Sequence, residues 1–212
     1  MNNGIKKHII WDFDGTLFDT YSVQARAMRD VLKEYYDVIE DAALIESKML
    51  VTMSHALKFF IEERCLGPEF ETRFYERARD YELEHAKPFD GVKELLDLIC
   101  RYAGRNYLHT HRGASAFALM DKYQLKRYFT DFVTGEDNFP RKPDPAGLLF
   151  MMNKHGIDKP DAIMIGDREL DVQAARNAGI ASCLITHGNE SHTDADYTAF
   201  ELNDVVEFCL RL

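Results

Sequence analysis

The sequence has few cysteines, no long apolar run and no excess of positive charge. Its 212 residues include only these cysteines, none of them in a C-x-x-C pair: Cys65, Cys100, Cys183 and Cys209. This spacing is typical of reduced thiols and argues against a disulfide framework or a zinc knuckle. No segment approaches the length of a membrane span, and the apolar run before Asp12 is too short for a signal peptide. We therefore expect a soluble, cytoplasmic protein.

The net charge is -10 at pH 7, so basic residues are in deficit. This balance argues against nucleic acid or an anionic membrane as the main partner, because both bind basic surfaces. A small anionic ligand is still compatible with it, since one local basic pocket is enough. Hydrophobic residues make up 46% of the chain, which predicts a folded core within one domain, or one domain with an insertion.

Short apolar runs rich in β-branched residues recur along the chain and predict a parallel sheet. The runs are continuous and not alternating, as expected for strands that are covered on both faces. They lie at residues 8–11, 106–110, 131–134, 162–166 and 181–186. Helical periodicity separates most of them. The pattern predicts an α/β fold, with a Rossmann-like parallel sheet between layers of helices and right-handed crossovers.

One connection is much longer than an ordinary crossover. The segment 19–87 contains helical periodicity and no convincing strand. We predict a core domain made from residues 1–18 and 88–212, with residues 19–87 inserted as a helical cap domain. The alternative is that these helices pack on the sheet as part of one core.

Polar residues gather where the predicted strands end. In an open α/β sheet, ligands bind beyond the carboxyl ends of the strands. The residues found there are Asp12 and Asp14, Thr110, Lys142, and Asp167 with Asp171. A single aspartate in such a place is usually a cap or turn residue. Converging carboxylates, however, repel each other unless a cation lies among them, and oxygen ligands without nearby histidine or cysteine clusters favour Mg²⁺.

Four segments, in order, resemble the motifs of the haloacid dehalogenase superfamily. They read DFDGTLFDT, LHTHRG, RKPDP and IGDRELD. The insertion after the first motif is similar to the helical-cap subfamily that includes phosphoglycolate phosphatase and β-phosphoglucomutase. The resemblance covers residues 9 to about 185, and its first and fourth motifs are the most specific. It implies the fold inferred above from the strand and helix pattern.

The resemblance implies three catalytic roles. Asp12 matches the nucleophile that forms an aspartyl-phosphate, and Asp14 matches the general acid/base for the leaving group and for water. Lys142 matches the lysine that pairs with the nucleophile and with phosphoryl oxygens. Dehalogenase members lack an aspartate at the position of Asp14, because a halide leaves without a proton. Asp14 therefore indicates phosphoryl chemistry.

The resemblance also implies ligands for phosphate and for Mg²⁺. Thr110 matches the residue whose hydroxyl holds the phosphoryl group, and the backbone N–H of His111, together with Lys142, completes that cradle. The implied metal ligands are the carboxylate of Asp12, the backbone carbonyl of Asp14 and the carboxylate of Asp167. Asp171 matches the fourth-motif acid, which we assign to the support of these ligands.

These assignments predict a Mg²⁺-dependent phosphatase that hydrolyses a small phosphate monoester through an aspartyl-phosphate. A phosphomutase that acts on a sugar phosphate shares every core residue and remains an alternative. A protein that only binds phosphate is a second alternative, although the presence of all the catalytic residues argues against it. The expected partner is a small phosphorylated metabolite, and the expected state is a monomer.

Several residues near the motifs have two interpretations. The second motif of close relatives often reads Thr-Asn or Ser-Asn, whereas here His111 and Arg112 follow the threonine. Arg112 contacts a substrate anion or is a solvated residue at a helix start. Lys48 and His55 contact substrate from the cap or are surface residues. His187 lines the site or belongs to a polar surface loop.

Overall fold

The computed structural model describes residues 7–188 and 194–210, and this part of the chain separates into two compact units. The first, which we call the sheet unit, falls within residues 1–18 and 88–212. The second, the helical unit, is Asp19–Lys87. Each unit has its own buried apolar cluster, and each is described below by itself.

The sheet unit contains a six-stranded sheet in the order β5-β4-β1-β6-β7-β8. Its strands are β1 (His8–Trp11), β4 (Arg105–His109), β5 (Phe129–Val133), β6 (Ala162–Gly166), β7 (Ala181–Ile185) and β8 (Tyr197–Ala199). Every neighbouring pair is parallel. The predicted parallel α/β sheet is confirmed, and among the strands of this sheet only β8, of three residues, lies where no strand was predicted. Strand β1 is central, and Trp11 lies opposite Leu108 on one side and Ile165 on the other.

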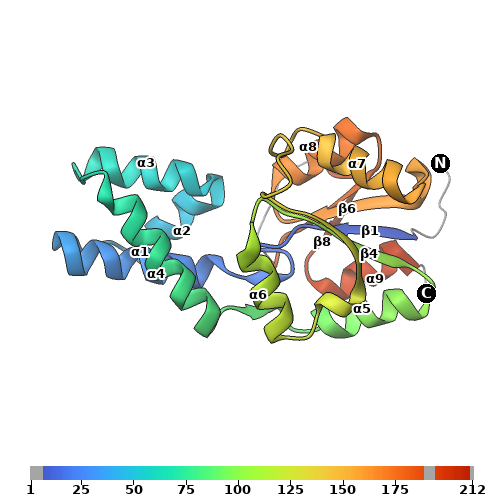
Figure 1. Ribbon diagram of the computed structural model, residues 1–212, viewed down its shortest axis with the longest axis horizontal. Coiled ribbons are helices and arrows are strands. Elements are labelled where there is room, and N and C mark those ends of the chain that lie inside the picture. Colours follow the sequence, from blue (N-terminus) through green and yellow to red (C-terminus); the bar gives the residue numbers. More distant parts are fainter. Residues whose placement is uncertain (1–6, 189–193, 211–212) are drawn as a thin grey trace. The chain divides into compact units, whose positions relative to one another are not determined.

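Helices cover both faces of this sheet. They are α5 (Val92–Arg101), α6 (Ala114–Lys122), α7 (Ala146–His155), α8 (Glu169–Ala178) and α9 (Leu202–Leu210), with short 3₁₀ turns η1 (Lys126–Tyr128) and η2 (Lys159–Asp161). Figure 1 shows α7 and α8 on one face and α5 and α9 on the other. These helices bury apolar side chains, as in α8, where Val172, Ala174 and Ala175 are buried. Two covered faces explain the continuous apolar strands.

A buried polar link fixes the central strand against its neighbour. The indole Nε1–H of Trp11 donates to Oδ1 of Asn106 over 2.9 Å, and both residues are fully buried. The amide nitrogen of Asn106 donates in turn to the carbonyl oxygens of Leu96 and Tyr128, each over 3.2 Å. Because every polar atom of this link has a partner, burying it does not carry the cost of an unsatisfied group.

The helical unit contains four helices: α1 (Tyr21–Tyr36), α2 (Ala42–Val51), α3 (Met53–Glu63) and α4 (Glu69–His85). Short strands β2 (Phe18–Asp19) and β3 (Lys87–Pro88) form a two-stranded sheet where the chain enters and leaves this unit. Its core includes Phe60, Phe70 and Phe74, all buried. None of the helices in the described part of the chain combines the length and the apolar character needed to cross a lipid bilayer.

Two residues of the helical unit were predicted to contact substrate or to lie on the surface. Lys48 is on α2, where its ammonium group lies 4.3 Å from the centre of the Phe59 ring. His55 is an exposed residue in the first turn of α3, and its backbone N–H donates to the Thr52 hydroxyl that caps the helix. Neither contact tests whether the side chains reach a substrate, so both interpretations of Lys48 and His55 stay predictions.

Candidate active site

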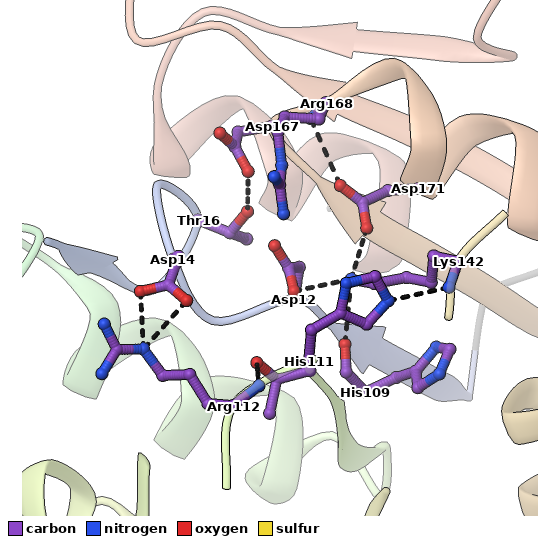
Figure 2. Close-up of polar contacts among 11 residues, drawn as sticks. Asp12, Asp14, Thr16, His109, His111, Arg112, Lys142, Asp167, Arg168 and Asp171 are labelled. Atoms are coloured by element: carbon purple, nitrogen blue, oxygen red, sulfur yellow. Dashed lines mark hydrogen bonds and ion pairs between the residues drawn. The ribbon is translucent and has the colours of Figure 1, made fainter. Parts of the chain in front are cut away.

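The residues predicted from the strand ends come together at the carboxyl edge of the sheet. Asp12 follows β1, and its backbone N–H donates to the Ile165 carbonyl over 2.8 Å, so the strand pairing extends into the site. Thr110 follows β4, with its N–H bonded to the Val133 carbonyl over 2.9 Å. Figure 2 shows Asp12, Asp167 and Asp171 facing a common space, with Lys142 reaching in from the loop before α7. The ends of β1, β4 and β6 thus carry Asp12, Thr110 and Asp167.

Lys142 is the centre of the charge network. Its Nζ atom donates to Oδ1 of Asp12 and to Oδ1 of Asp171, both over 2.6 Å, and to the His109 carbonyl over 3.1 Å. The side chain is 0% exposed. An ammonium group has three protons, and here each has an acceptor. The buried ammonium charge of Lys142 is tolerated because each of its protons has an acceptor.

The charges around Lys142 set the protonation of its partners. Burial would raise the pKa of Asp12, but the positive charges of Lys142 and Arg168 outweigh it and lower that pKa. Burial would lower the pKa of Lys142, but Asp12 and Asp171 raise it. Burial raises the pKa of Asp171 to about 6, against the opposing charge of Lys142. The network therefore keeps Asp12 as a carboxylate, the form that acts as a nucleophile or a metal ligand.

The second carboxylate oxygen of Asp12 fits a metal ion or a reacting group. Within the described residues, nothing hydrogen-bonds to this buried Oδ2 atom, and an unsatisfied buried anion is costly. Carboxylate oxygens of Asp12, Asp167 and Asp171 lie within 4.8 Å of one another. Asp167 also accepts a hydrogen bond from the Thr16 hydroxyl over 3.2 Å. Clustered carboxylate oxygens of this kind suit a hard divalent cation such as Mg²⁺.

Asp14 lies beside Arg112 and not beside Lys142. The Nε–H of Arg112 donates to both carboxylate oxygens of Asp14, over 2.7 and 2.9 Å. The Nη1 atom donates to the Ser115 hydroxyl over 3.2 Å, and the guanidinium lies 5.5 Å from the centre of the Phe13 ring. The Arg112 side chain is only 10% exposed. The interpretation of Arg112 as a solvated residue is therefore wrong, because its charge is used by an aspartate far away in the sequence.

The threonine and the histidine of the second motif make different contacts. Thr110 Oγ1 accepts the backbone N–H of Arg112 over 3.1 Å, which leaves the hydroxyl proton to be donated to a ligand. His111 Nε2 accepts the backbone N–H of Lys142 over 2.7 Å, so the proton of the neutral ring is on Nδ1. Burial, helped by the charge of Lys142, lowers the pKa of His111 to about 4. The ring is therefore neutral at pH 7, as an acceptor must be.

His187 supports the loop that carries Asp14. Its Nε2–H donates to the Gly15 carbonyl over 2.8 Å, and its ring stacks on Phe89 with 3.9 Å between centres. His187 is a partly buried residue of the turn after β7, and whether it lines the site stays a prediction; residues 189–193 of that loop lie outside the described residues. The sequence showed only that a histidine follows a strand end, and this did not predict its hydrogen bond to the Gly15 carbonyl.

Comparisons with known proteins agree with this arrangement. Residues 9–185 match the model of the haloacid dehalogenase-like hydrolase family. A phosphoglycolate phosphatase of Vibrio parahaemolyticus is 29% identical, with 95% of each chain covered. Phosphoglycolate phosphatase 1 of Pseudomonas aeruginosa is 32% identical, with 85% of this chain and 69% of the relative covered.

The fold has matches among solved structures as well. A structure from Thermotoga maritima described as a candidate β-phosphoglucomutase has a TM-score of 0.78, 24% sequence identity, and covers 91% of this chain and 94% of its own. At that identity the match supports the fold alone. The family match spans all four strand ends that carry the clustered aspartates, the threonine and the lysine. The predicted membership is confirmed: the chain belongs to the haloacid dehalogenase-like hydrolases.

Proposed function

We propose that the protein is a Mg²⁺-dependent phosphatase that hydrolyses a small phosphate monoester through an aspartyl-phosphate intermediate. The observation that carries this proposal is the state of Asp12: a buried carboxylate, with Oδ1 held by Lys142 and Oδ2 without a hydrogen-bond partner among the described residues. Relatives named phosphoglycolate phosphatase support a phosphatase over a mutase. They make 2-phosphoglycolate the first substrate to test.

In the first half of the proposed reaction, a carboxylate oxygen of Asp12 forms a bond to phosphorus while the bond to the leaving oxygen breaks. Asp14, in its protonated form, gives its proton to that oxygen, and an alcohol departs. Lys142 pairs with Asp12, and its positive charge beside the nucleophile offsets the repulsion between two anions. The Thr110 hydroxyl donates to the phosphoryl group.

In the second half, water attacks phosphorus and the bond between phosphorus and Asp12 breaks. Asp14, now a carboxylate, accepts the proton of the water, so that inorganic phosphate leaves and both aspartates return to their starting forms. The same side chain therefore acts first as an acid and then as a base. Both half-reactions need Asp14 to be directed at the same point in space, close to the oxygen that gains or loses a proton.

Asp12 and Asp167 are the proposed carboxylate ligands of Mg²⁺, with the backbone carbonyl of Asp14 as a third. The bound ion would supply positive charge that stabilises the phosphoryl oxygens. Asp171 is proposed to hold Lys142 and not the ion, because its Oδ1 atom is 2.6 Å from Nζ. Mg²⁺ usually takes one or two carboxylates, which fits this division of three clustered aspartates.

We further propose that the helical unit, Asp19–Lys87, is the cap of this family member and selects a small phosphorylated metabolite. Caps of this kind exclude water and bulky substrates during the reaction. A cytoplasmic location and a monomeric state stay predictions from the sequence.

The proposal is tested by measuring phosphate release from p-nitrophenyl phosphate and from a panel of phosphorylated metabolites, with and without Mg²⁺. We expect Mg²⁺-dependent turnover, loss of turnover on adding EDTA, and no turnover by Asp12→Asn. The Asp12→Asn protein should keep the circular dichroism spectrum of the wild type, because the amide replaces the carboxylate in the same volume. Near-normal turnover by this well-folded variant would contradict the role of Asp12.

A further inference from the structure

We propose that His111 and Arg112 are positioning residues that divide the support of the site between them: His111 fixes Lys142, and Arg112 fixes Asp14. The inference rests on the proposed function, since it assigns each contact to a step of that reaction. The two residues directly follow Thr110 in the sequence. Neither contact is visible in the sequence, because each joins segments that are far apart along the chain.

His111 acts through the backbone of Lys142. The bond from the Lys142 N–H to His111 Nε2 is 2.7 Å long, and His111 is partly buried. The groups that face this ring are the charges of Lys142, Asp12, Arg141 and Arg168. The lysine reaches its three acceptors only if its backbone starts from the right place. A neutral ring that anchors the backbone therefore sets where the ammonium group lies.

Arg112 acts through the carboxylate of Asp14. The Nε–H lies between both carboxylate oxygens, and the Ser115 hydroxyl and the Phe13 ring hold the guanidinium from other directions. The Asp14 side chain is 19% exposed, so water competes only weakly for it. An aspartate side chain has two rotatable bonds, and a contact with both oxygens restrains both. When Asp14 is protonated, one oxygen keeps the contact with Arg112 while the other carries the proton, so Arg112 fixes the direction in which Asp14 presents that proton.

The two supports have different kinetic consequences. Lys142 interacts with charge on the phosphoryl group, which is the same whatever alcohol leaves. Asp14 protonates the leaving oxygen, and this help matters more for a strongly basic oxygen than for a weakly basic one. Losing the His111 anchor should therefore slow all substrates alike. Losing the Arg112 contact should slow substrates with poor leaving groups much more than those with good ones.

The experiment compares kcat/KM for p-nitrophenyl phosphate and phenyl phosphate, which have similar shapes and leaving groups of different basicity. The variants are Arg112→Met, which keeps length without a donor, and Arg112→Lys, which keeps a donor. For His111 they are His111→Leu and His111→Gln, whose side-chain oxygen can accept the Lys142 N–H. Arg101→Met is the matched control, because Arg101 pairs with Asp97 on exposed α5 and its side chain is 73% exposed. Thermal unfolding of each variant is measured in parallel.

We expect Arg112→Met to lower kcat/KM for phenyl phosphate about 10- to 100-fold more than for p-nitrophenyl phosphate, within the range that general acid catalysis provides. We expect His111→Leu to lower both by a similar factor of roughly 10, and His111→Gln to recover most of the loss. Arg112→Lys should recover part of the phenyl phosphate activity. Arg101→Met should leave both rates unchanged. Arg112→Lys and His111→Gln keep the test valid if Arg112→Met or His111→Leu fails to fold.

The results that overturn the inference are separate from those that overturn the proposed function. If the wild type hydrolyses both esters but Arg112→Met and Arg112→Lys lose them equally, Arg112 does not position Asp14. If removing the arginine speeds phenyl phosphate hydrolysis, the contact restrains Asp14 instead of directing it, and the inference is wrong. If His111→Gln is as slow as His111→Leu, the hydrogen bond from the Lys142 N–H does not account for the loss of activity. If the wild type releases phosphate from neither ester and from no metabolite of the panel, the proposed function fails, and the inference that rests on it fails as well.

Discussion

His109 should make the protein less stable in mild acid, and replacing it should remove much of that sensitivity. The side chain is 2% exposed, and within residues 7–188 and 194–210 nothing hydrogen-bonds to its Nδ1 atom. Burial, together with the charge of Lys142, lowers the pKa of His109 to about 3. In the unfolded chain the ring titrates near 6.5. Between these values the unfolded chain binds a proton that the folded protein does not.

The sign and the size of the effect follow from this difference. Because the folded-state pKa is lowered, stability is fully present above pH 6.5 and falls as the pH drops toward 3. Each pH unit in this window costs about 1.4 kcal/mol. From pH 7 to pH 5, His109 alone should therefore lower the free energy of unfolding by about 2 kcal/mol. On the same change of pH, the free energy of unfolding of His109→Leu should fall by about 2 kcal/mol less than that of the wild type.

The assay is urea unfolding of the wild type and His109→Leu at pH 7 and pH 5. The packing cost of the leucine cancels, because each protein is compared with itself at two pH values. His55→Leu, at an exposed histidine of the helical unit, is the control and should keep the pH dependence of the wild type. Equal losses of stability in the wild type and in His109→Leu would refute the reasoning.

Three further perturbations have distinct expected outcomes. Lys142→Met should lower the free energy of unfolding by about 3–5 kcal/mol, because it leaves two buried carboxylates without their partner. Urea denaturation measures this, and an unchanged midpoint would show that Lys142 does not stabilise the two carboxylates. Asn106→Leu should cost about 1–3 kcal/mol, because the Trp11 N–H loses its acceptor; a shift in melting temperature checks this, and no shift would rule it out. Thr110→Val should lower kcat/KM for p-nitrophenyl phosphate by roughly tenfold without unfolding the protein, since one hydrogen bond to the phosphoryl group is lost. Steady-state kinetics measure the activity and circular dichroism checks the fold. Full activity would show that the Thr110 hydroxyl does not bind the phosphoryl group.

The fold was largely predictable because its signals are local. A continuous apolar run such as Ile9–Trp11 reports a strand covered on both faces, and this needs no knowledge of its neighbours. The rule that ligands bind beyond the carboxyl ends of parallel strands then brings Asp12, Thr110 and Asp167 to one edge. Strand β8 was not predicted, because three residues after a polar loop carry too little periodicity to recognise.

The side-chain partners were not predictable in the same way. Arg112 meets Asp14 across 98 positions of sequence, and His111 meets Lys142 across 31. Periodicity says which edge of the sheet a residue occupies, but not which of several nearby groups its side chain contacts. Counting charge at the strand ends could have found Arg112, since a buried aspartate without a cation is costly. No comparable signal pointed from His187 to a backbone carbonyl.

The position of β1 in the sheet affects how the protein is made. It precedes the other strands in the described part of the chain, and both of its partners, β4 and β6, lie far along the sequence. On a ribosome one of its two edges remains unpaired until β6 has emerged, and unpaired apolar strands are prone to aggregate. A chain that ends before β6 thus leaves one edge of β1 unpaired, and this edge can pair with strands of other molecules.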